Sequence, residues 1–217
     1  EEAGREARYG AFSEVLSSLG GGKIAVAHHG DDQAETVLMR IFRGTGTDGL
    51  SGMDYQREPN VIRPLLAVRR KEIEDYCREA GLEFVTDGTN LKAIYSRNAV
   101  RLKLIPEANR LFGGDVSQSL WSLSEIARED REFIASFVDE VLNKGRFSKG
   151  QAEFSFLELK ALHPSVRKRV LMKSFARLGQ VRDIGAAHLN EIEILMASNK
   201  TVWASDFPGG GRVKRRY

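Results

Sequence analysis

The chain has 217 residues, of which 41% are hydrophobic and 29% are charged, a balance typical of globular proteins that excludes disordered and collagen-like chains. One cysteine excludes an intrachain disulfide and a cysteine-based zinc site, and no apolar run approaches the roughly 18 residues of a membrane span. We therefore expect a folded, soluble, cytoplasmic protein with no membrane partner.

The charge is distributed unevenly along the chain. The net charge is +3, with 16 Lys and Arg against 17 Asp and Glu in residues 1–110, and 17 against 13 in residues 111–217. The length suits two domains, each with its own core. Because the basic excess lies in the second half, we expect any nucleic-acid surface there.

The beginning of the chain predicts a helix, a strand and a second helix. The helix covers residues 1–19 and ends at three glycines, and the apolar residues 24–27 predict a strand buried on both faces of a parallel sheet. Apolar residues at helical spacing predict the second helix over residues 31–43, with Gly44 as its C-cap. This order is typical of an α/β sheet.

A glycine-rich segment follows over residues 44–60, and its length favours a functional loop. Residues 61–66 predict a short strand broken by a proline, and residues 68–80 predict a helix closed by Gly81. Phe84 and Val85 could form one more short strand before a turn.

The second half is dominated by helical patterns. Helices are expected over about residues 115–142, 164–178 and 185–198, and a β-hairpin closes the chain. We place a domain boundary near residue 110. The predicted fold is a partial α/β nucleotide-binding domain with a parallel sheet at residues 1–110, followed by a mainly α-helical domain with a terminal β-hairpin at residues 111–217.

The densest group of titratable side chains lies between the first strand and the second helix: His28, His29, Asp31, Asp32 and Glu35. Ligands of open α/β sheets bind beyond the carboxyl ends of the strands, and a helix N-terminus there adds positive potential. The alternative is a capping box of Asp32 with Glu35, or a cap by Asp31. Two histidines beside the acids favour a ligand site. Neighbouring strand residues point to opposite faces, so His28 and His29 are not expected to share a metal ion.

A second group contains Arg97 and Arg101, which lie one turn apart on one face if residues 96–104 are helical. Two guanidinium groups so placed suit a carboxylate or a phosphate, because each planar fork donates two parallel hydrogen bonds. The alternative is a solvated helix face.

A third group is basic and lies on the helix predicted over residues 164–178, opposite its apolar stripe. It consists of Arg169, Lys173 and Arg177, with Arg167 and Lys168 nearby. These side chains could contact a phosphate backbone, or they form a solvated face.

Five short motifs follow one another between residues 28 and 101. They are His28-His29-x-Asp31-Asp32-Gln33-Ala34-Glu35-Thr36, Arg43-Gly44-Thr45-Gly46 with Gly49-Leu50, Arg63-Pro64-Leu65, Asp87-x-Thr89-Asn90 and Arg97-Asn98-x-x-Arg101. In this order they resemble the motif series of the tRNA(Ile)-lysidine synthetases of the PP-loop ATP pyrophosphatase superfamily. The resemblance covers roughly residues 5–110, and the helical remainder is similar to that family's tRNA-binding part more loosely.

The resemblance implies a ligase that uses ATP, with Mg²⁺, to adenylate the C2 oxygen of the wobble cytidine of an isoleucine tRNA. The ε-amine of L-lysine then displaces AMP. It implies that Asp32 and Glu35 bind the amine, that Arg101 with Arg97 binds the carboxylate, and that His28 lies near the reacting cytidine or phosphate. We infer proton transfer by His28, because imidazole titrates near neutrality. The oligomeric state stays open, and a homodimer is allowed.

One family motif has no match in this sequence. The family holds ATP on a Ser-Gly-Gly-x-Asp-Ser loop after the first strand, whereas residues 20–23, Gly-Gly-Gly-Lys, precede a strand. The sequence also begins without methionine and stops on a predicted strand. We therefore expect a piece of a longer enzyme that lacks the ATP-binding loop and is inactive by itself.

Two other functions stay open at this point. A metal-dependent phosphohydrolase could use His28 and Asp32 as metal ligands, and bound metal would favour it. A non-catalytic module could bind tRNA without carrying out chemistry.

Overall fold

The structure is a computed structural model that describes residues 2–57, 59–84, 96–179, 184–198 and 200–216, without the side chains of residues 2–6. The chain divides into two compact units, Glu1–Arg131 and Glu132–Tyr217, and the division falls inside the long helix α7 (Val116–Lys144). Residue 110 lies inside the helix α6 (Ile105–Phe112), which precedes α7. The domain boundary that we expected near that residue remains a prediction.

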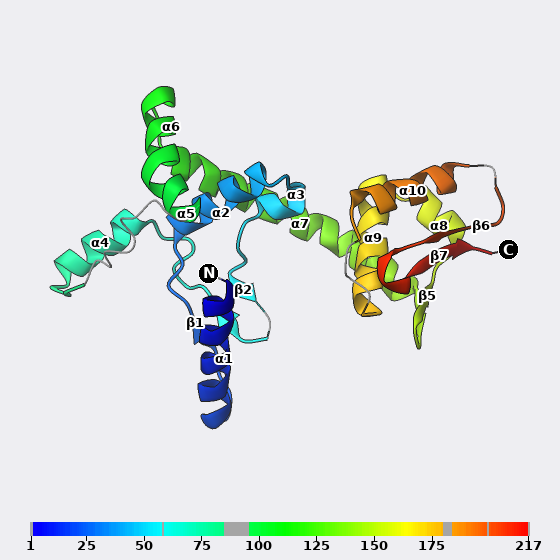
Figure 1. Cartoon of the computed structure of the whole chain (residues 1–217), viewed down its shortest axis with the longest axis horizontal. Coiled ribbons are helices and arrows are strands. Elements are labelled where there is room, and N and C mark those ends of the chain that lie inside the picture. The colour runs from blue at the N-terminus through cyan, green and yellow to red at the C-terminus, as the bar shows by residue number, and fades with distance from the viewer. Residues whose placement is uncertain (1, 58, 85–95, 180–183, 199, 217) are drawn as a thin grey trace. The chain divides into compact units, whose positions relative to one another are not determined.

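The first unit begins with helix α1 (Glu2–Ser18) and a small sheet (Figure 1). Strand β1 (Ile24–Ala25) pairs in parallel with β3 (Val61–Ile62), and β2 (Gln56–Arg57) pairs antiparallel with the other edge of β3. The expected parallel sheet is therefore present as one short pair in a mixed sheet. Strand β2 was not predicted, because its two residues are polar and exposed and lie in a glycine-rich segment.

Helices α2 (Gly30–Phe42) and α3 (Thr47–Leu50) lie between β1 and β2, and helix α4 (Arg70–Glu79) follows β3. Helices α2 and α4 confirm the predictions for residues 31–43 and 68–80. Gly44 follows α2 with a φ of +78°, a left-handed conformation that glycine adopts without strain. Helix α3 is a single turn inside the predicted loop, too short to show a periodic pattern.

A continuous helical run begins after the undescribed residues 85–95. It consists of α5 (Ser96–Ala99), a π-helical turn η2 (Val100–Leu104) and α6 (Ile105–Phe112), which Gly113 ends with a φ of +67°. The predicted helix over residues 96–104 is thus confirmed as a helix, with a wider turn inside it. Val100 and Ile105 of this run are buried, as are Ala34 and Val37 of α2.

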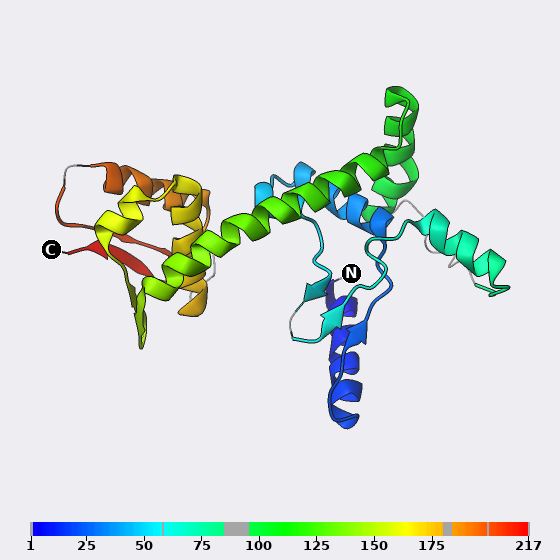
Figure 2. The same ribbon diagram turned by 180° about the vertical axis from the view of Figure 1, so that it is seen from behind.

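The second unit combines two hairpins with three helices (Figures 1 and 2). Its elements after α7 are β4 (Arg146–Ser148), β5 (Gln151–Glu153), α8 (Phe156–Ala161), α9 (Pro164–Arg177), α10 (Ala186–Ala197), β6 (Trp203–Asp206), a 3-10 turn η3 (Pro208–Gly210) and β7 (Arg212–Arg215). The predicted helices over about residues 115–142, 164–178 and 185–198 and the terminal hairpin are confirmed. The hairpin β4–β5 and helix α8 were not predicted.

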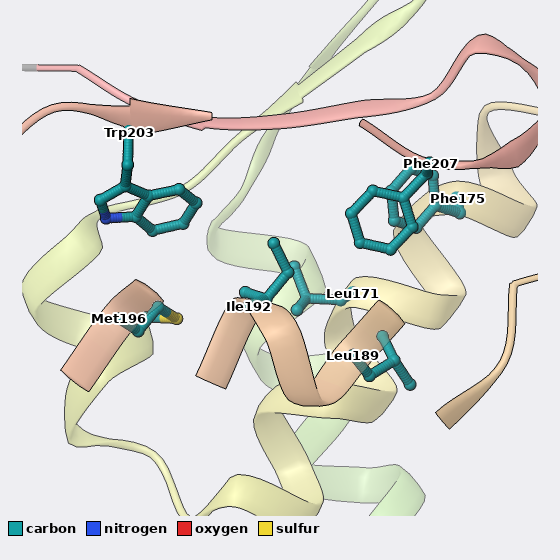
Figure 3. Close-up of a cluster of buried hydrophobic side chains, with 7 residues drawn as sticks. All are labelled: Leu171, Phe175, Leu189, Ile192, Met196, Trp203 and Phe207. Carbon is teal, nitrogen blue, oxygen red and sulfur yellow. The ribbon is translucent and has the colours of Figure 1, made fainter. Parts of the chain in front are cut away.

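The core of the second unit lies between α9, α10 and the terminal hairpin (Figure 3). Its buried side chains are Leu171, Phe175, Leu189, Ile192, Met196, Trp203 and Phe207. The rings of Phe175 and Phe207 lie 4.9 Å apart between centroids. A second cluster of Val138, Leu142 and Val170 packs the end of α7 against α9. The apolar stripe predicted for α9 is therefore its core face.

Of the helices in the described part of the chain, none combines the length and the apolar character that crossing a lipid bilayer requires.

Candidate functional site

Helix α2 begins with a reciprocal cap between His29 and Asp32. The His29 N–H donates to Asp32 Oδ2 at 3.1 Å, and the Asp32 N–H donates to His29 Nδ1 at 3.4 Å. These bonds satisfy backbone groups that lack partners in the first helical turn. The alternative of a cap by Asp31, or by Asp32 with Glu35, is not what the structure has, because His29 occupies the cap position and Asp32 is its reciprocal partner.

Asp32 and Glu35 converge on one guanidinium group. Arg101 Nε donates to Glu35 Oε1 at 2.5 Å, and Arg101 Nη2 donates to Asp32 Oδ1 at 2.7 Å and to Glu35 Oε2 at 3.1 Å. Arg101 lies in the π turn, which packs against α2. The two acids share a face of α2 because they are three residues apart. Two groups of residues that the sequence singled out separately thus meet in space.

Arg97 joins the same cluster from one turn earlier. Its Nη2 donates to Thr36 Oγ1 at 2.9 Å, and its Nε lies 3.7 Å from Glu35 Oε2. The Thr36 hydroxyl donates in turn to the Asp32 carbonyl oxygen at 2.8 Å. The predicted common face of Arg97 and Arg101 is confirmed, and it points at α2 rather than at solvent. We call Asp32, Glu35, Arg97 and Arg101 the ion cluster.

Burial strengthens the electrostatics of the ion cluster. The Glu35 side chain is only 2% exposed, and burial raises the pKa of Glu35, with the hydrogen bond and the charge of Arg101 acting in the opposite direction. Burial acts to lower the pKa of Arg101, but the contacts with Glu35 and Asp32 outweigh it and raise that pKa. In the ion cluster, the carboxylates of Asp32 and Glu35 therefore bind the guanidinium group of Arg101 in a largely buried position.

Asp31 takes a different role from Asp32, although the two are neighbours. Its Oδ1 accepts from Arg69 Nη2 at 2.8 Å, and its Oδ2 accepts from the Arg70 N–H at 2.8 Å at the start of α4. Burial raises the pKa of Asp31, yet the bonds from Arg69 and Arg70 outweigh it and lower that pKa. Asp31 thus joins α2 to α4.

His28 lies in the segment between β1 and α2 and is half-buried. The histidine that the structure places against the acids is His29, with Nε2 at 3.4 Å from Asp32 Oδ2 and Nδ1 at 3.8 Å from Asp31 Oδ2. The role expected for His28 stays a prediction.

A buried amide fixes the loop after α3. Gln33 is fully buried; its Nε2 donates to the carbonyl oxygens of Ser51 at 2.9 Å and Met53 at 3.1 Å, and its Oε1 accepts from the Met53 N–H at 2.7 Å. Sequence reasoning did not assign this role. The available signal was a polar residue in the same helical turn as the apolar Ala34 and Val37.

Three arginines complete this loop. Arg40 Nη1 donates to the carbonyl oxygens of Gly49 and Gly52 at 2.9 and 2.6 Å, and Arg63 Nη1 donates to that of Asp54 at 2.7 Å. Arg128 of α7 donates to that of Met53 at 2.9 Å. Two of the five motifs, over residues 43–50 and 63–65, therefore contribute to one rigid loop. The motif at residues 87–90 lies outside the described residues.

The three basic residues expected to bind tRNA already have partners on the second unit. Lys173 Nζ lies 2.8 Å from Asp139 Oδ1, Arg169 Nη1 donates to the Ser165 carbonyl oxygen at 3.1 Å, and Arg177 lies over the Phe147 ring at 4.2 Å. Lys173 and Arg177 are exposed. Their binding role stays a prediction.

Arg167 differs from these three residues because it is buried. Its Nε donates to Glu193 Oε1 at 2.8 Å, and its Nη1 donates to the carbonyl oxygens of Leu159, Lys160 and Leu162 at 3.2, 3.0 and 3.2 Å. It therefore ends α8 and joins α9 to α10.

The phosphohydrolase alternative required a metal at His28 and Asp32. In the part of the chain that the structure describes, no three His, Cys, Asp or Glu side chains gather as metal ligands. The carboxylate of Asp32 is instead engaged by a guanidinium and by a backbone N–H. This arrangement does not favour the phosphohydrolase.

Comparison with known proteins gives matches at both ends of the chain. Residues 1–108 match the family model described as PP-loop domain, and residues 154–217 match the one described as TilS substrate binding domain.

Curated relatives match across most of the chain. The tRNA(Ile)-lysidine synthase of Clostridioides difficile strain 630 is 38% identical over 205 residues, which cover 92% of this chain and 44% of the relative. That of Clostridium tetani strain Massachusetts / E88 is 37% identical, with 88% and 41% covered. That of Geobacter sulfurreducens is 35% identical, with 100% and 47% covered. The chain thus spans about half the length of the curated relatives it matches.

Proposed function

Because the chain belongs to the tRNA(Ile)-lysidine synthase family, we propose that it is part of a ligase that attaches L-lysine to the wobble cytidine of an isoleucine tRNA. The C2 oxygen of the cytidine first forms a bond to the α-phosphorus of ATP, while the bond from that phosphorus to the β-phosphate oxygen breaks and pyrophosphate leaves. The lysine amine then forms a bond to C2, while the bond from C2 to the oxygen of AMP breaks and AMP leaves with the electron pair.

The ion cluster is the observation that carries this proposal. Asp32 and Glu35 hold a cation that has N–H donors, and the lysine ammonium is another cation of that kind. In the proposed complex the ammonium takes the place of the Arg101 guanidinium between the two acids. Arg101 and the partly exposed Arg97 then receive the α-carboxylate, which needs parallel N–H donors.

This exchange preserves the charge balance of the site. In the described state two carboxylates face two guanidinium groups, and bound lysine adds one positive and one negative charge. No charge is therefore left buried without a counter-charge, which would be costly. The same balance favours a substrate with both an amine and a carboxylate over a simple diamine.

Proton transfer is the second task of the site. An ammonium has no electron pair to attack C2, so it must lose a proton before the bond forms. We assign that proton to Glu35, because burial raises its pKa and makes it a better acceptor than an exposed carboxylate. Asp32 orients the amine, and His28 is the proposed proton carrier on the cytidine or phosphate side.

ATP and Mg²⁺ are proposed as cosubstrates from the family assignment. The acids at the start of α2 do not fit a magnesium site, because Asp31 is engaged by Arg69 and Asp32 by Arg101. None of them is assigned to the metal, and no step is assigned to it.

Binding of the isoleucine tRNA is proposed for the second unit, through Arg169, Lys173 and Arg177 of α9. The support is the match of residues 154–217 to the substrate binding domain, together with the exposed positions of Lys173 and Arg177.

The test uses the gene product that contains this chain, incubated with isoleucine tRNA transcript, ATP and isotope-labelled L-lysine. We expect labelled lysidine at the wobble position by mass spectrometry of nuclease digests, dependent on ATP. Glu35→Gln should abolish most of the product, and Glu14→Gln on the exposed face of α1 should not. Absence of lysidine with a folded wild-type protein would refute the proposal.

A further inference from the structure

The π turn η2 is an unusual feature of the helix that carries Arg101. The Ile105 N–H donates to the Val100 carbonyl oxygen, five residues earlier, whereas an α-helix joins residues four apart. The π turn is continuous with α5 before it and with α6 after it, so one extra residue is accommodated inside a single helical run.

The sequence supplies a physical cause for this turn in Pro106, the second residue of α6. Proline has no N–H to donate to the carbonyl oxygen four residues earlier, and its ring collides with that carbonyl, here of Leu102. A wider preceding turn relieves the collision. Pro106 is exposed, so its presence is not explained by packing in the core.

The extra residue decides which side chains face α2. Val100 and Ile105 are both buried, at 8% and 7% exposure, yet residues five apart on a regular α-helix point about 140° away from each other. The wider turn reduces this angle, and Arg101 within it bonds to Asp32 and Glu35. A regular helix would rotate Arg101 relative to α6 by about 100°, the angle of one residue.

We propose that Pro106 is a positioning residue of the lysine site: it imposes the π turn that keeps Arg101 beside Asp32 and Glu35, where its guanidinium can receive the lysine α-carboxylate. The inference rests on the proposed function, because the experiment that tests it measures the use of L-lysine. Pro106 acts through Arg101 and touches no substrate. The guanidinium fork makes directional hydrogen bonds to a carboxylate, so a rotated helix cannot present it to the lysine α-carboxylate.

The experiment replaces Pro106 by alanine in the gene product that contains this chain. Pro106→Ala restores the N–H and removes the ring, so the helix can become regular. We expect the KM for L-lysine to rise at least tenfold while the KM for ATP stays within twofold. The matched control is Pro59→Ala, which alters an exposed turn between β2 and β3 and should leave both values unchanged.

A double-mutant cycle separates positioning from a general effect on structure. If Pro106 acts through Arg101, then adding Pro106→Ala to Arg101→Ala should cause no further loss of lysine use. Independent effects that multiply would overturn the proposal, as would an unchanged lysine KM in a folded Pro106→Ala variant. Urea unfolding verifies that each variant is folded. If Pro106→Ala does not fold, Pro106→Ser, which also restores the N–H, is measured in the same cycle.

Different results would refute the proposed function and the positioning role of Pro106. Wild-type protein that forms no lysidine refutes the proposed function, whatever Pro106 does. Wild-type protein that forms lysidine, with variants at Pro106 that use lysine normally, refutes only the positioning role.

Discussion

Three acids within five residues of α2 serve three different purposes. Asp31 bonds to the start of α4, Asp32 both caps α2 and holds Arg101, and Glu35 is buried against Arg101. Helix geometry explains the division, because residues 32 and 35 share a face while residue 31 points about 100° away from residue 32. From the sequence, helix capping and ligand binding were alternative roles for Asp32. In the structure, Asp32 caps α2 and also binds the guanidinium group of Arg101.

The raised pKa of Glu35 predicts a specific pH dependence of stability. A carboxyl whose pKa is higher in the folded protein than its ordinary value of 4.5 binds its proton more tightly when folded. Its contribution is fully present below pH 4.5 and is lost as the pH rises through the folded pKa. The unfolding free energy of wild type minus that of Glu35→Gln should therefore fall across this window, as measured by urea unfolding. A difference that grows with pH would contradict the assignment.

Gly52 is the residue on which the loop after α3 depends most. Its φ is +61°, and a Cβ there would lie 2.6 Å from the Gln33 side chain, which is fully buried. Gly52→Ala should destabilise the protein by about 1–3 kcal/mol from backbone strain, with the collision adding to it. Gly114→Ala is the control, because a Cβ at that position meets nothing within 4 Å. Equal unfolding midpoints for the two variants would show that the loop is not held as described.

At the scale of elements, long periodic segments were predictable and short ones were not. Helices α2, α7, α9 and α10 follow their apolar spacing, since one face of each is buried. Strand β2, helix α3 and the hairpin β4–β5 are two to four residues per element, too short for a pattern. Helix α3 is held by a side-chain bond instead, since Arg40 of α2 donates to the Gly49 carbonyl oxygen.

The sequence predicted which residues form the candidate site, but not which of them contact one another. Residue types and motif order singled out Asp32, Glu35, Arg97 and Arg101. Pairing between α2 and the π turn could not be read from the sequence, because it requires the tertiary arrangement of segments more than 60 residues apart. The effect of Pro106 on helix geometry is visible only once the continuous run from α5 to α6 is known.

In the second unit, Arg167 of α9 is expected to stabilise the contacts of α9 with α8 and α10. Arg167→Ala would leave the partly buried carboxylate of Glu193 without its guanidinium partner and three carbonyl oxygens at the end of α8 without their donor. We expect a loss of about 3–5 kcal/mol in unfolding free energy, the usual cost of breaking one side of a buried ion pair. Lys168→Ala, on the same helix and with its Nζ bonded to the exposed Asn190 of α10, should cost far less. Similar losses would contradict a structural role for Arg167.

At the scale of the whole molecule, the basic excess lies in residues 111–217, the half of the chain where the tRNA is proposed to bind. Reversing Arg169, Lys173 and Arg177 together to glutamate should weaken tRNA binding and flatten its salt dependence by roughly one unit of slope per lost phosphate contact. Reversal of Arg70, Lys71 and Arg78 on α4 is the charge-matched control. Filter binding over a series of salt concentrations gives both slopes. If the α9 variant keeps the wild-type affinity and slope, that helix is merely solvated.

The central claim is that Asp32 binds the lysine amine, and the most direct measurement compares two adjacent acids in the gene product that contains this chain. Asp32→Asn removes one charge from the ion cluster, whereas Asp31→Asn removes one from the contact with Arg69. Losing a hydrogen bond between charged groups costs about 1.5–3 kcal/mol, so Asp32→Asn should raise the KM for L-lysine about tenfold to a hundredfold. Asp31→Asn should leave that KM near the wild-type value, and neither variant should change the KM for ATP. Equal lysine KM values for the two folded variants would mean that Asp32 does not bind the lysine amine and serves only to cap α2 and to pair with Arg101.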